Sequence, residues 1–274
     1  MYVGIDIGGT KTLVASLDDN GVITEKIRFE TPQDYDQELQ EIKKSFESLA
    51  AKEFTAGGAG IPGAIDRVHH RALNFGNLSW TNLPIFTDLE KITNCPMVVE
   101  NDAKLAGLSE AMLVKHEYNK VLYLTVSTGI GAALIENRKI VTATADLGGA
   151  SIPIVYRGKV ISLDNFISGK SIVKRYGKMA CDIDDSATWD QICRDMASAL
   201  VQLIAIMDPD LVVIGGSVGT QFPKYGDILI HYLKKYELPL FTIPPIREAG
   251  RPEEAVLFGC YDLAKEQFAH AYLG

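Results

Sequence analysis

The sequence is poor in cysteine and has no closely spaced cysteine pair. Its four cysteines are far apart along the chain, and none of them forms a C-x-x-C motif. A small secreted protein held together by disulfides would need cysteines at regular, closer spacings. We therefore expect reduced thiols and an intracellular protein.

The chain also lacks an excess of positive charge and a long apolar run. It has 27 Lys and Arg residues against 35 Asp and Glu residues, a net charge of −8 at pH 7, which leaves no broad basic face for a nucleic-acid backbone. No uncharged apolar run approaches the ~20 residues of a membrane span, and Asp6 lies where a signal peptide would be apolar. We expect a cytoplasmic protein that binds neither nucleic acid nor membranes. A small phosphorylated ligand stays compatible with this charge, because a few backbone N–H groups and one cation can bind a phosphate.

What the sequence does contain is a repeated order of elements that is typical of an α/β protein. At 274 residues it is about twice the ~150 residues that serve as a guide for one domain. Residues 2–30 and 121–135 each contain β-rich runs separated by a glycine turn, and helical patterns follow both. Two similar halves predict an α/β fold with mixed sheets, two domains and a cleft between the domains.

Apolar spacing predicts the main helices. A helix is expected to start at Thr31-Pro32, because apolar residues recur every three or four positions after it. In a second helix, a buried stripe is expected at Ile192, Met196, Leu200, Leu203 and Met207. The expected helices cover 31–49, 188–207, 225–236 and 253–268, and residues 77–82 are expected to form an irregular loop.

The first candidate site is the glycine turn after the first expected strand. The segment D-I-G-G-T-K, from Asp6 to Lys11, places an acid at the end of a buried strand beside two residues that tolerate positive φ. Backbone N–H groups in such a turn can bind phosphate oxygens, the Thr10 hydroxyl can donate, and Asp6 can hold hydrated Mg²⁺. A tight hairpin without a ligand is the alternative interpretation of this motif. A second glycine turn, T-G-I-G from Thr128 to Gly131, favours phosphate binding, because two turns facing one cleft could hold one polyphosphate.

Six segments, taken in order, resemble the motifs of the ROK sugar kinases, a family of the actin/hexokinase-like superfamily. They are V-G-I-D-I-G-G-T-K-T from Val3, G-I-P-G from Gly60, N-L-S-W from Asn77, E-N-D-A from Glu100, S-T-G-I-G from Ser127 and V-I-G-G from Val213. The resemblance implies two actin-like domains of the ribonuclease H type. It also implies transfer of the γ-phosphoryl group of ATP, with Mg²⁺, to a hexose hydroxyl, the 6-hydroxyl as in a glucokinase.

The same resemblance implies roles for individual residues. Asp102 is the expected general base, because a carboxylate within hydrogen-bond reach can take the proton of an alcohol as the new P–O bond forms. The alternative is that Asp102 only caps the helix that begins there. Asp6 is expected to hold Mg²⁺ through water. The expected phosphate- and ATP-binding residues are Asp6, Gly8, Gly9, Thr10, Lys11, Thr128, Gly129, Gly131, Gly215 and Gly216. The expected sugar-binding residues are Gly63, Asn82, Asn101, Asp102, Asp146 and Asp164.

The sequence departs from the family pattern around the sugar. The family's Glu-x-Gly-His segment has Asp146 and Gly149 as its first and last residues here, and a later family glutamate is Asp164. Many members have a cysteine-rich zinc loop beside the histidine, but no cysteine lies between Cys95 and Cys181, so we expect no zinc. Two shorter carboxylates and a missing histidine predict weaker recognition of glucose, with an amino sugar as the favoured substrate, unless neighbouring groups or water replace the contacts.

The resemblance also places the domain boundaries and the partners. We expect a small domain formed by residues 1–106 and 253–274, on which the last helix packs, and a larger domain formed by residues 107–252. The expected partners are a small sugar and ATP, and a homodimer is left open. No added DNA-binding domain is expected, because Met1 is one residue from the first expected strand. Two other classes stay open: a nucleotide- or sugar-binding regulatory protein without catalysis, and an actin-like filament subunit.

Overall fold

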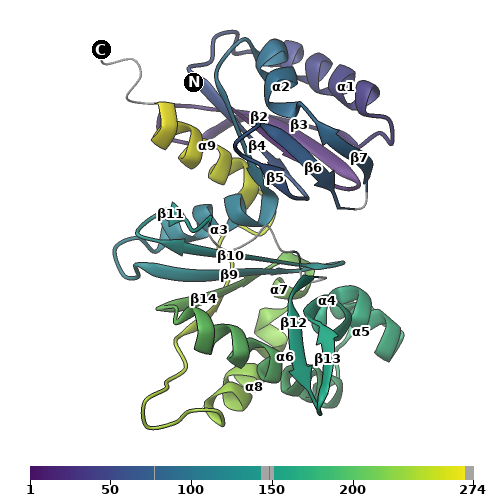
Figure 1. Ribbon diagram of the computed structural model, residues 1–274, viewed down its shortest axis with the longest axis vertical. Helices are drawn as coiled ribbons and strands as arrows, with labels where there is room; N and C mark the ends of the chain where they lie inside the picture. The colour runs from purple at the N-terminus through teal and green to yellow at the C-terminus, as the bar shows by residue number, and fades with distance from the viewer. Residues whose placement is uncertain (77, 143–147, 149–150, 269–274) are drawn as a thin grey trace. The chain divides into compact units, whose positions relative to one another are not determined.

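The structure is a computed structural model, and it describes residues 1–76, 78–142, 148 and 151–268. The chain divides into two compact units (Figure 1). Unit 1 comprises Met1–Ser109 and the C-terminal segment from Glu253, and unit 2 comprises Glu110–Pro252. Each unit has a five-stranded mixed sheet with helices packed on it, which confirms the predicted α/β class.

The sheet of unit 1 brings three carboxyl-terminal strand ends to one edge. Its strands, in order across the sheet, are β3 (Ile23–Glu30), β2 (Lys11–Leu17), β1 (Tyr2–Ile7), β4 (Ala56–Ile61) and β8 (Met97–Asn101). β1, β4 and β8 are parallel, whereas β1, β2 and β3 form an antiparallel meander. Because parallel strands end at the same edge of a sheet, the first glycine turn and the start of α3 (Asp102–Leu113) lie at that edge.

Helices cover both faces of this sheet (Figure 1). α1 (Tyr35–Ser48) and α2 (Ile85–Thr93) lie on one face, and α9 (Ala255–Phe268) packs against β1 and β4 on the other. Glycine allows α9 to lie this close to the sheet, because a Cβ on Gly58 would be 2.6 Å from the backbone oxygen of Cys260. The amphipathic pattern of the last helix therefore corresponds to real packing within unit 1.

Helix α1 begins later than predicted, and it buries an acid beside the predicted apolar face, of which Ile42 and Leu49 are fully buried. Asp34 caps the helix, which begins at Tyr35 and not at Thr31, because the Asp34 carboxylate accepts a backbone N–H of the first turn. Glu38 is fully buried, whereas Leu39, which the apolar spacing places in the buried stripe, is only partly buried. The spacing of apolar residues predicts which apolar side chains are buried, so it cannot identify a buried acid such as Glu38.

The segment 77–82, expected as a loop, is a strand from residue 78 onward. β7 (Leu78–Leu83) pairs with β6 (Arg71–Phe75), which pairs with β5 (Ile65–Asp66) in a small antiparallel sheet. Trp80 is buried between exposed neighbours, which is the two-residue period of a half-buried strand. The loop prediction was wrong because polar residues alternate with apolar ones here, and the alternation is short.

Unit 2 repeats the arrangement of a glycine turn at the end of a parallel pair. Its main strands, in order across the sheet, are β11 (Lys139–Ile140), β10 (Ile130–Glu136), β9 (Lys120–Val126), β14 (Leu211–Gly215) and β15 (Ile246–Glu248). β9 and β14 are parallel, and β9 and β10 form an antiparallel hairpin. The turn of this hairpin and the end of β14 therefore meet at one edge of the sheet.

Helices and a small hairpin complete unit 2. The remaining elements are β12 (Pro153–Tyr156), β13 (Lys159–Ser162), α4 (Leu163–Ile167), α5 (Gly169–Tyr176), a 3₁₀ turn (Ala180–Asp182), α6 (Ser186–Met207), α7 (Gly216–Gly219) and α8 (Phe222–Lys234). α6 packs against α8. Of its predicted stripe, Met207 is only partly buried, and the fully buried members are Ile192, Met196, Leu200 and Leu203.

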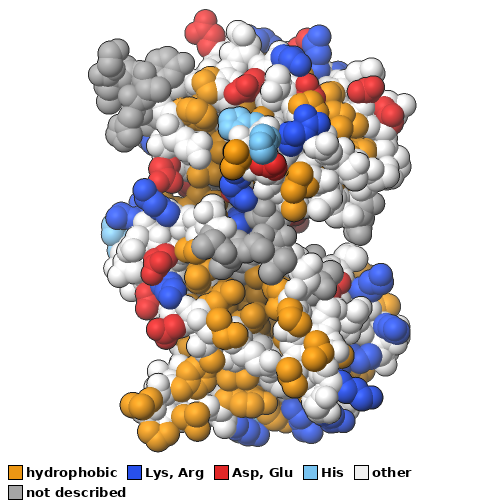
Figure 2. Space-filling view, in the orientation of Figure 1, with side chains coloured by type: hydrophobic (Ala, Val, Ile, Leu, Met, Phe, Trp, Pro, Cys, Tyr) orange, Lys and Arg blue, Asp and Glu red, His pale blue; other side chains and the backbone are white. Residues whose placement is uncertain are grey.

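Several large apolar side chains of unit 2 remain exposed. Figure 2 shows apolar side chains spread over the visible face of this unit, and among the exposed residues are Ile206, Leu238 and Leu240. Exposed apolar residues are common on monomeric proteins, so they do not by themselves indicate a partner, and the homodimer stays a prediction. None of the described helices has both the length and the apolar character that crossing a membrane requires.

Candidate active site

The first glycine turn lies between β1 and β2 in unit 1. The N–H of Gly8 donates to the carbonyl oxygen of Lys11 at 2.9 Å, which closes the turn. A Cβ on Gly8 would lie 2.7 Å from the same oxygen, so this closure requires glycine. Gly9 is partly exposed and Thr10 is exposed, which leaves their N–H and hydroxyl groups accessible to a phosphate.

Asp102 lies at the junction of β8 and α3, where two hydrogen bonds hold its neighbour. The Asn101 carboxamide oxygen accepts the N–H of Lys104 at 3.2 Å, and its Nδ2 donates to the carbonyl oxygen of Gly63 at 3.1 Å. Asn101, and not Asp102, thus accepts the backbone N–H that the capping residue of a helix normally accepts. Its bond to Gly63 also joins two of the predicted sugar-binding residues. Asp102 Oδ1 accepts the N–H of Ala103 at 2.7 Å, which fixes the direction of this partly exposed carboxylate.

Asp6 and Asp102 approach each other across a glycine. Asp6 pairs with Gly60 in the β1–β4 ladder, and a Cβ on Gly60 would lie 3.6 Å from Asp102 Cα. The same Cβ would also lie 2.4 Å from Val256 Cγ1 on α9. Glycine at this position therefore places the end of β1 and the start of α3 close together, with no strand side chain between them.

This arrangement shifts the pKa values of both acids upward. Burial is the main cause that raises the pKa of Asp6 to about 7, the negative charge of Asp102 adds to the rise, and the Lys11 ammonium opposes it. Burial also raises the pKa of Asp102 to about 6, against the hydrogen bond from Ala103 N–H. Two acids with raised pKa values at the end of a strand are typical of a functional site.

The charge pattern fits a divalent cation held with a phosphate ligand. Two neighbouring carboxylates repel each other, and a divalent cation would relieve that repulsion. Within the described ranges, no group of three or more His, Cys, Asp and Glu side chains could hold a metal ion by themselves. Mg²⁺ commonly binds through one or two carboxylates, water and substrate phosphates, and Asp6 beside the phosphate turn meets that description.

Glu100 is a residue to which the sequence analysis gave no role. It is buried, its Oε2 accepts Arg67 Nε at 2.9 Å, and its Oε1 accepts the backbone N–H of Asn101 at 2.7 Å. A buried carboxylate needs such partners, so the pair holds the end of β8 next to Asp102. The E-N-D-A motif contained the signal for Glu100, whereas nothing in the sequence links Arg67 to it.

Asn82, the other amide expected to bind sugar, is engaged elsewhere. It is exposed, with φ of 52°, and its Oδ1 accepts Arg71 Nε at 2.6 Å. The Arg71 guanidinium also donates to the Asn82 carbonyl oxygen. Among the hydrogen bonds of the described residues, none joins Asn82 to Asn101 or Asp102, and its sugar-binding role stays a prediction.

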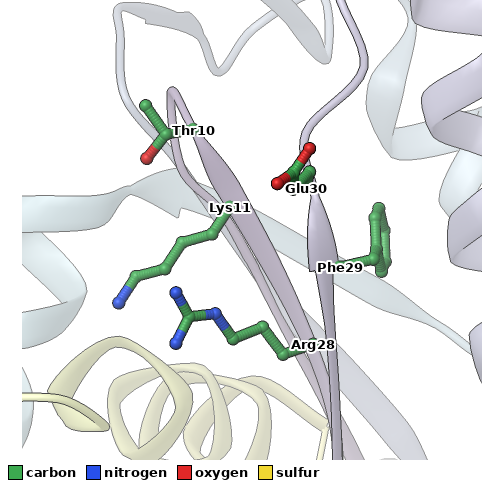
Figure 3. Close-up of a pocket in the computed structure, with 5 residues that line it drawn as sticks. All are labelled: Thr10, Lys11, Arg28, Phe29 and Glu30. Carbon is green, nitrogen blue, oxygen red and sulfur yellow. The ribbon is translucent and has the colours of Figure 1, made fainter.

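A groove beside the phosphate turn carries positive charge. Its volume is about 400 Å³, and the residues that line it are Thr10, Lys11, Arg28, Phe29 and Glu30. Figure 3 shows the Lys11 ammonium and the Arg28 guanidinium directed to the same region, and Glu30, the cross-strand partner of Lys11, also lines the groove. Two cations next to a glycine turn favour an anionic ligand such as a phosphate. Arg28 is a second residue to which the sequence analysis gave no role.

In unit 2, Asp164 lies at the second glycine turn. Its Oδ1 accepts the N–H of Ile130 at 2.8 Å, and a Cβ on Gly129 would lie 3.0 Å from the same oxygen. Gly216 has φ of 78°, and its Cβ would lie 2.5 Å from the carbonyl oxygen of Val126 at the end of β9. The structure therefore brings residues of the second turn, the V-I-G-G segment and Asp164 to one edge of this sheet.

The remaining predicted residues of unit 2 lie near the same edge or outside the described residues. Thr128 is exposed in the turn, and Gly131 forms an isolated bridge with Gly148. Gly215 ends β14, where a Cβ would lie 2.5 Å from the Tyr123 hydroxyl. Asp146 lies outside the described residues.

Comparison with known proteins shows the family. A model of the ROK family matches residues 2–267, and the chain belongs to this family. It is similar to the N-acetylgalactosamine kinase AgaK of Shewanella sp. (strain ANA-3), with 26% identity over 94% of this chain and 96% of that protein. It is also similar to an N-acetyl-D-glucosamine kinase of Yersinia pseudotuberculosis serotype O:3 (strain YPIII), with 29% identity over 91% and 94% of the two chains.

A solved structure with the same fold is that of a ROK family glucokinase from Streptomyces griseus in complex with glucose and AMPPNP. Its TM-score is 0.81 with 21% identity, and the match covers 97% of this chain and 99% of that chain. The predicted family and the two-domain actin-like fold are confirmed. The named relatives are sugar kinases, the class of enzyme that the sequence predicted.

Proposed function

We propose that this ROK protein transfers the γ-phosphoryl group of ATP to a hydroxyl of a hexose. The observation that carries the proposal is the pair of acids, Asp6 and Asp102, beside the Gly8 turn. Asp102 is partly exposed, and backbone hydrogen bonds fix it and its neighbour. Such a carboxylate can serve as a general base for an alcohol.

Each of the site residues would have a role that follows from its position at the sheet edge. Asp102 would take the proton of the sugar hydroxyl, while Asn101 and Gly63 would orient the sugar beside it. The N–H groups of the Gly8 turn, with Lys11, would bind the phosphates. Asp6 would hold Mg²⁺ through water, and the metal supplies positive charge that neutralises the phosphates during transfer. The second glycine turn, with Thr128, Gly129, Gly131, Gly215 and Gly216, would bind the rest of the nucleotide.

We further propose an N-acetylated amino sugar as the substrate, phosphorylated at the 6-hydroxyl. Two named relatives act on N-acetylated amino sugars, and the sequence has Gly149 where the family pattern has a histidine. Glycine lacks the side chain that would make the histidine contact to an unsubstituted sugar, and it is compatible with a bulkier substituent such as an acetamido group. The 6-hydroxyl is the primary alcohol of a hexose and the least hindered acceptor. ATP, Mg²⁺ and reduced thiols together favour a cytoplasmic location.

The test is ADP release with a panel of sugars. Glucose, mannose, fructose, N-acetylglucosamine and N-acetylmannosamine are each compared by kcat/KM with MgATP as donor, and ³¹P-coupled NMR of the product assigns the phosphorylated hydroxyl. The highest kcat/KM is expected with an N-acetylated sugar. ADP release with none of the sugars, together with nucleotide binding, would favour the regulatory alternative. A preference for glucose at micromolar KM would contradict the proposed substrate.

Asp6→Asn is expected to raise the Mg²⁺ concentration at which kcat is half-maximal. The substitution keeps the shape of the side chain and removes one negative charge from the shell of water around the metal. Loss of such an outer contact typically weakens metal affinity by ~10–100-fold. The measurement is a Mg²⁺ titration of kcat at saturating ATP and sugar. A titration curve that superimposes on that of the wild type would show that Asp6 has no metal role.

The rate should follow the ionisation of Asp102. At saturating Mg²⁺, which keeps Asp6 ionised against its raised pKa of about 7, kcat should rise with pH up to about 6, the pKa of Asp102, and level off above it, because the base must be ionised to accept a proton. Below that pH, kcat should fall about tenfold per unit. The measurement is kcat from pH 5 to pH 8 with saturating MgATP and sugar. The residual rate of Asp102→Asn should lack this dependence, and a flat wild-type profile would contradict the assignment.

A further inference from the structure

Glu38 of α1 is a buried acid with no cation beside it. Its exposed fraction is 0%, and its Oε2 is buried without any hydrogen-bond partner. An ionised carboxylate in such a place would carry an uncompensated charge, which is costly. A protonated carboxylic acid would have no charge to compensate. The surroundings therefore favour the neutral form of Glu38.

A line of hydrogen bonds runs from Glu38 to the phosphate turn. Glu38 Oε1 lies 2.6 Å from Thr12 Oγ1, and Thr12 Oγ1 lies 3.0 Å from Thr31 Oγ1. Thr31 Oγ1 in turn donates to the carbonyl oxygen of Gly8 at 2.8 Å, and the Thr31 N–H donates to the carbonyl oxygen of Thr10 at 3.2 Å. The two hydroxyl groups connect helix α1 to the Gly8 side of the turn, and the Thr31 N–H connects it to the Thr10 side.

Counting hydrogens along this line gives the ionisation state. Each threonine hydroxyl has one hydrogen, and the Thr31 hydrogen is used at Gly8, because a carbonyl oxygen can only accept. If the 3.0 Å contact between the two hydroxyls is also a hydrogen bond, its hydrogen comes from Thr12, which then cannot donate to Glu38 as well. The short contact between Thr12 and Glu38 is left without a hydrogen unless Glu38 supplies one. Three contacts need three hydrogens, and the third is present only when Glu38 is a carboxylic acid.

We propose that Glu38 is a positioning residue which, as a neutral carboxylic acid, donates to Thr12 and so orients the Gly8 turn for the phosphates of the nucleotide. This proposal rests on the proposed function for the identity of the ligand, but the ionisation state does not. Burial raises the pKa of Glu38 to about 7, against the hydrogen bond with Thr12, which lowers it, and the charge of Glu41 on the same helix adds to the rise. The groups that face Glu38 from β2 and from the segment before α1 are the uncharged hydroxyls of Thr12 and Thr31, and no cation is among the causes of the shift.

The ionisation state is tested by stability, without any ligand. An acid whose pKa is raised by folding stabilises the fold fully below its unfolded pKa, 4.5 for Glu38, and this contribution is lost as pH rises through the folded pKa, about 7. The urea midpoint of the wild type should therefore decline from pH 5 to pH 8 relative to that of Glu38→Gln, which cannot ionise. Glu47→Gln, an exposed acid on the same helix, is the matched control and should follow the wild type. Parallel curves for the wild type and Glu38→Gln would overturn the neutral acid.

The positioning role is tested by calorimetric titration with ATP. Glu38→Gln keeps a donor for Thr12, so its Kd should stay within about twofold of the wild type. Glu38→Met has no donor for Thr12. If this variant fails to fold, Thr31→Val takes its place, because it removes the hydrogen bond to the Gly8 carbonyl oxygen. Each should raise the Kd for ATP about three- to tenfold, the value of one neutral hydrogen bond. Unchanged Kd values in both would leave Glu38 as a structural residue and overturn the positioning role. A wild type that binds no ATP would refute the proposed function, whereas the urea curves would still decide the ionisation state.

Discussion

Asp102→Asn is expected to lower kcat by roughly 10²–10⁴-fold, the usual contribution of a general base. Asparagine has nearly the same shape, and its side-chain oxygen can still accept the N–H of Ala103, which donates to Asp102 Oδ1 at 2.7 Å. The start of α3 should therefore stay in place while the base is lost. The measurement is steady-state ADP release with the preferred sugar, together with the Kd for ATP from calorimetry.

The values of kcat and of the Kd for ATP together distinguish a general base from an acid that has only a structural role. The Kd for ATP should change little, because Asp102 acts on the acceptor hydroxyl and not on the nucleotide. Asp36→Asn is a matched control, since it removes an exposed carboxylate from the first turn of α1, and its kcat should equal that of the wild type. A kcat for Asp102→Asn within a few fold of the wild type would mean that another group takes the proton.

Gly259→Val should destabilise unit 1 by more than ~3 kcal/mol, at or beyond the upper end of the usual cost of overpacking. A Cβ on Gly259 would lie 2.1 Å from the backbone oxygen of Leu105. Backbone of α9 and α3 therefore touches directly, and no side chain there can rotate away. The measurement is urea unfolding in a Trp189→Phe background, in which Trp80 is the one remaining tryptophan and reports on unit 1.

A second glycine in a helix provides the comparison. A Cβ on Gly226 would lie 2.5 Å from the Phe222 ring, which is a side chain and can shift. Gly226→Ala should therefore cost less than Gly259→Ala, although both changes add the same methyl group. Equal losses for the two alanine variants would show that α9 can move away from α3, and the large effect expected for valine would then fail.

The fold was predictable where the sequence repeats a long, regular signal. The α/β class and the helix at 186–207 follow from apolar spacing over many residues. The strand β7 was missed because one buried Trp80 between exposed residues gives only a short alternation. The late start of α1 was missed because the Asp34 cap is a single side-chain contact, and Pro32, two residues earlier, gives an equally good start signal.

The sequence named candidate site residues but not their contacts. Motifs pointed to Asp6, Asp102 and Asn101, which lie at or next to strand ends, and their roles stay predictions. The sequence could not show that Asn82 is held by Arg71 or that Glu100 pairs with Arg67, because the partners come from separate strands and loops. Pairing between distant residues depends on the register of the sheet, and a single sequence does not contain that register.

The packing of α9 on β1 and β4 has a consequence for how the chain folds during synthesis. The sheet of unit 1 is complete on the ribosome once β8 has emerged, but the helix that covers one of its faces is made only after all of unit 2. At ~5–20 residues per second, that face stays uncovered for roughly 10–30 s. Unit 2 is contiguous in the chain, whereas unit 1 cannot cover its sheet until the last helix has been made, so unit 1 should be the later of the two to complete its packing.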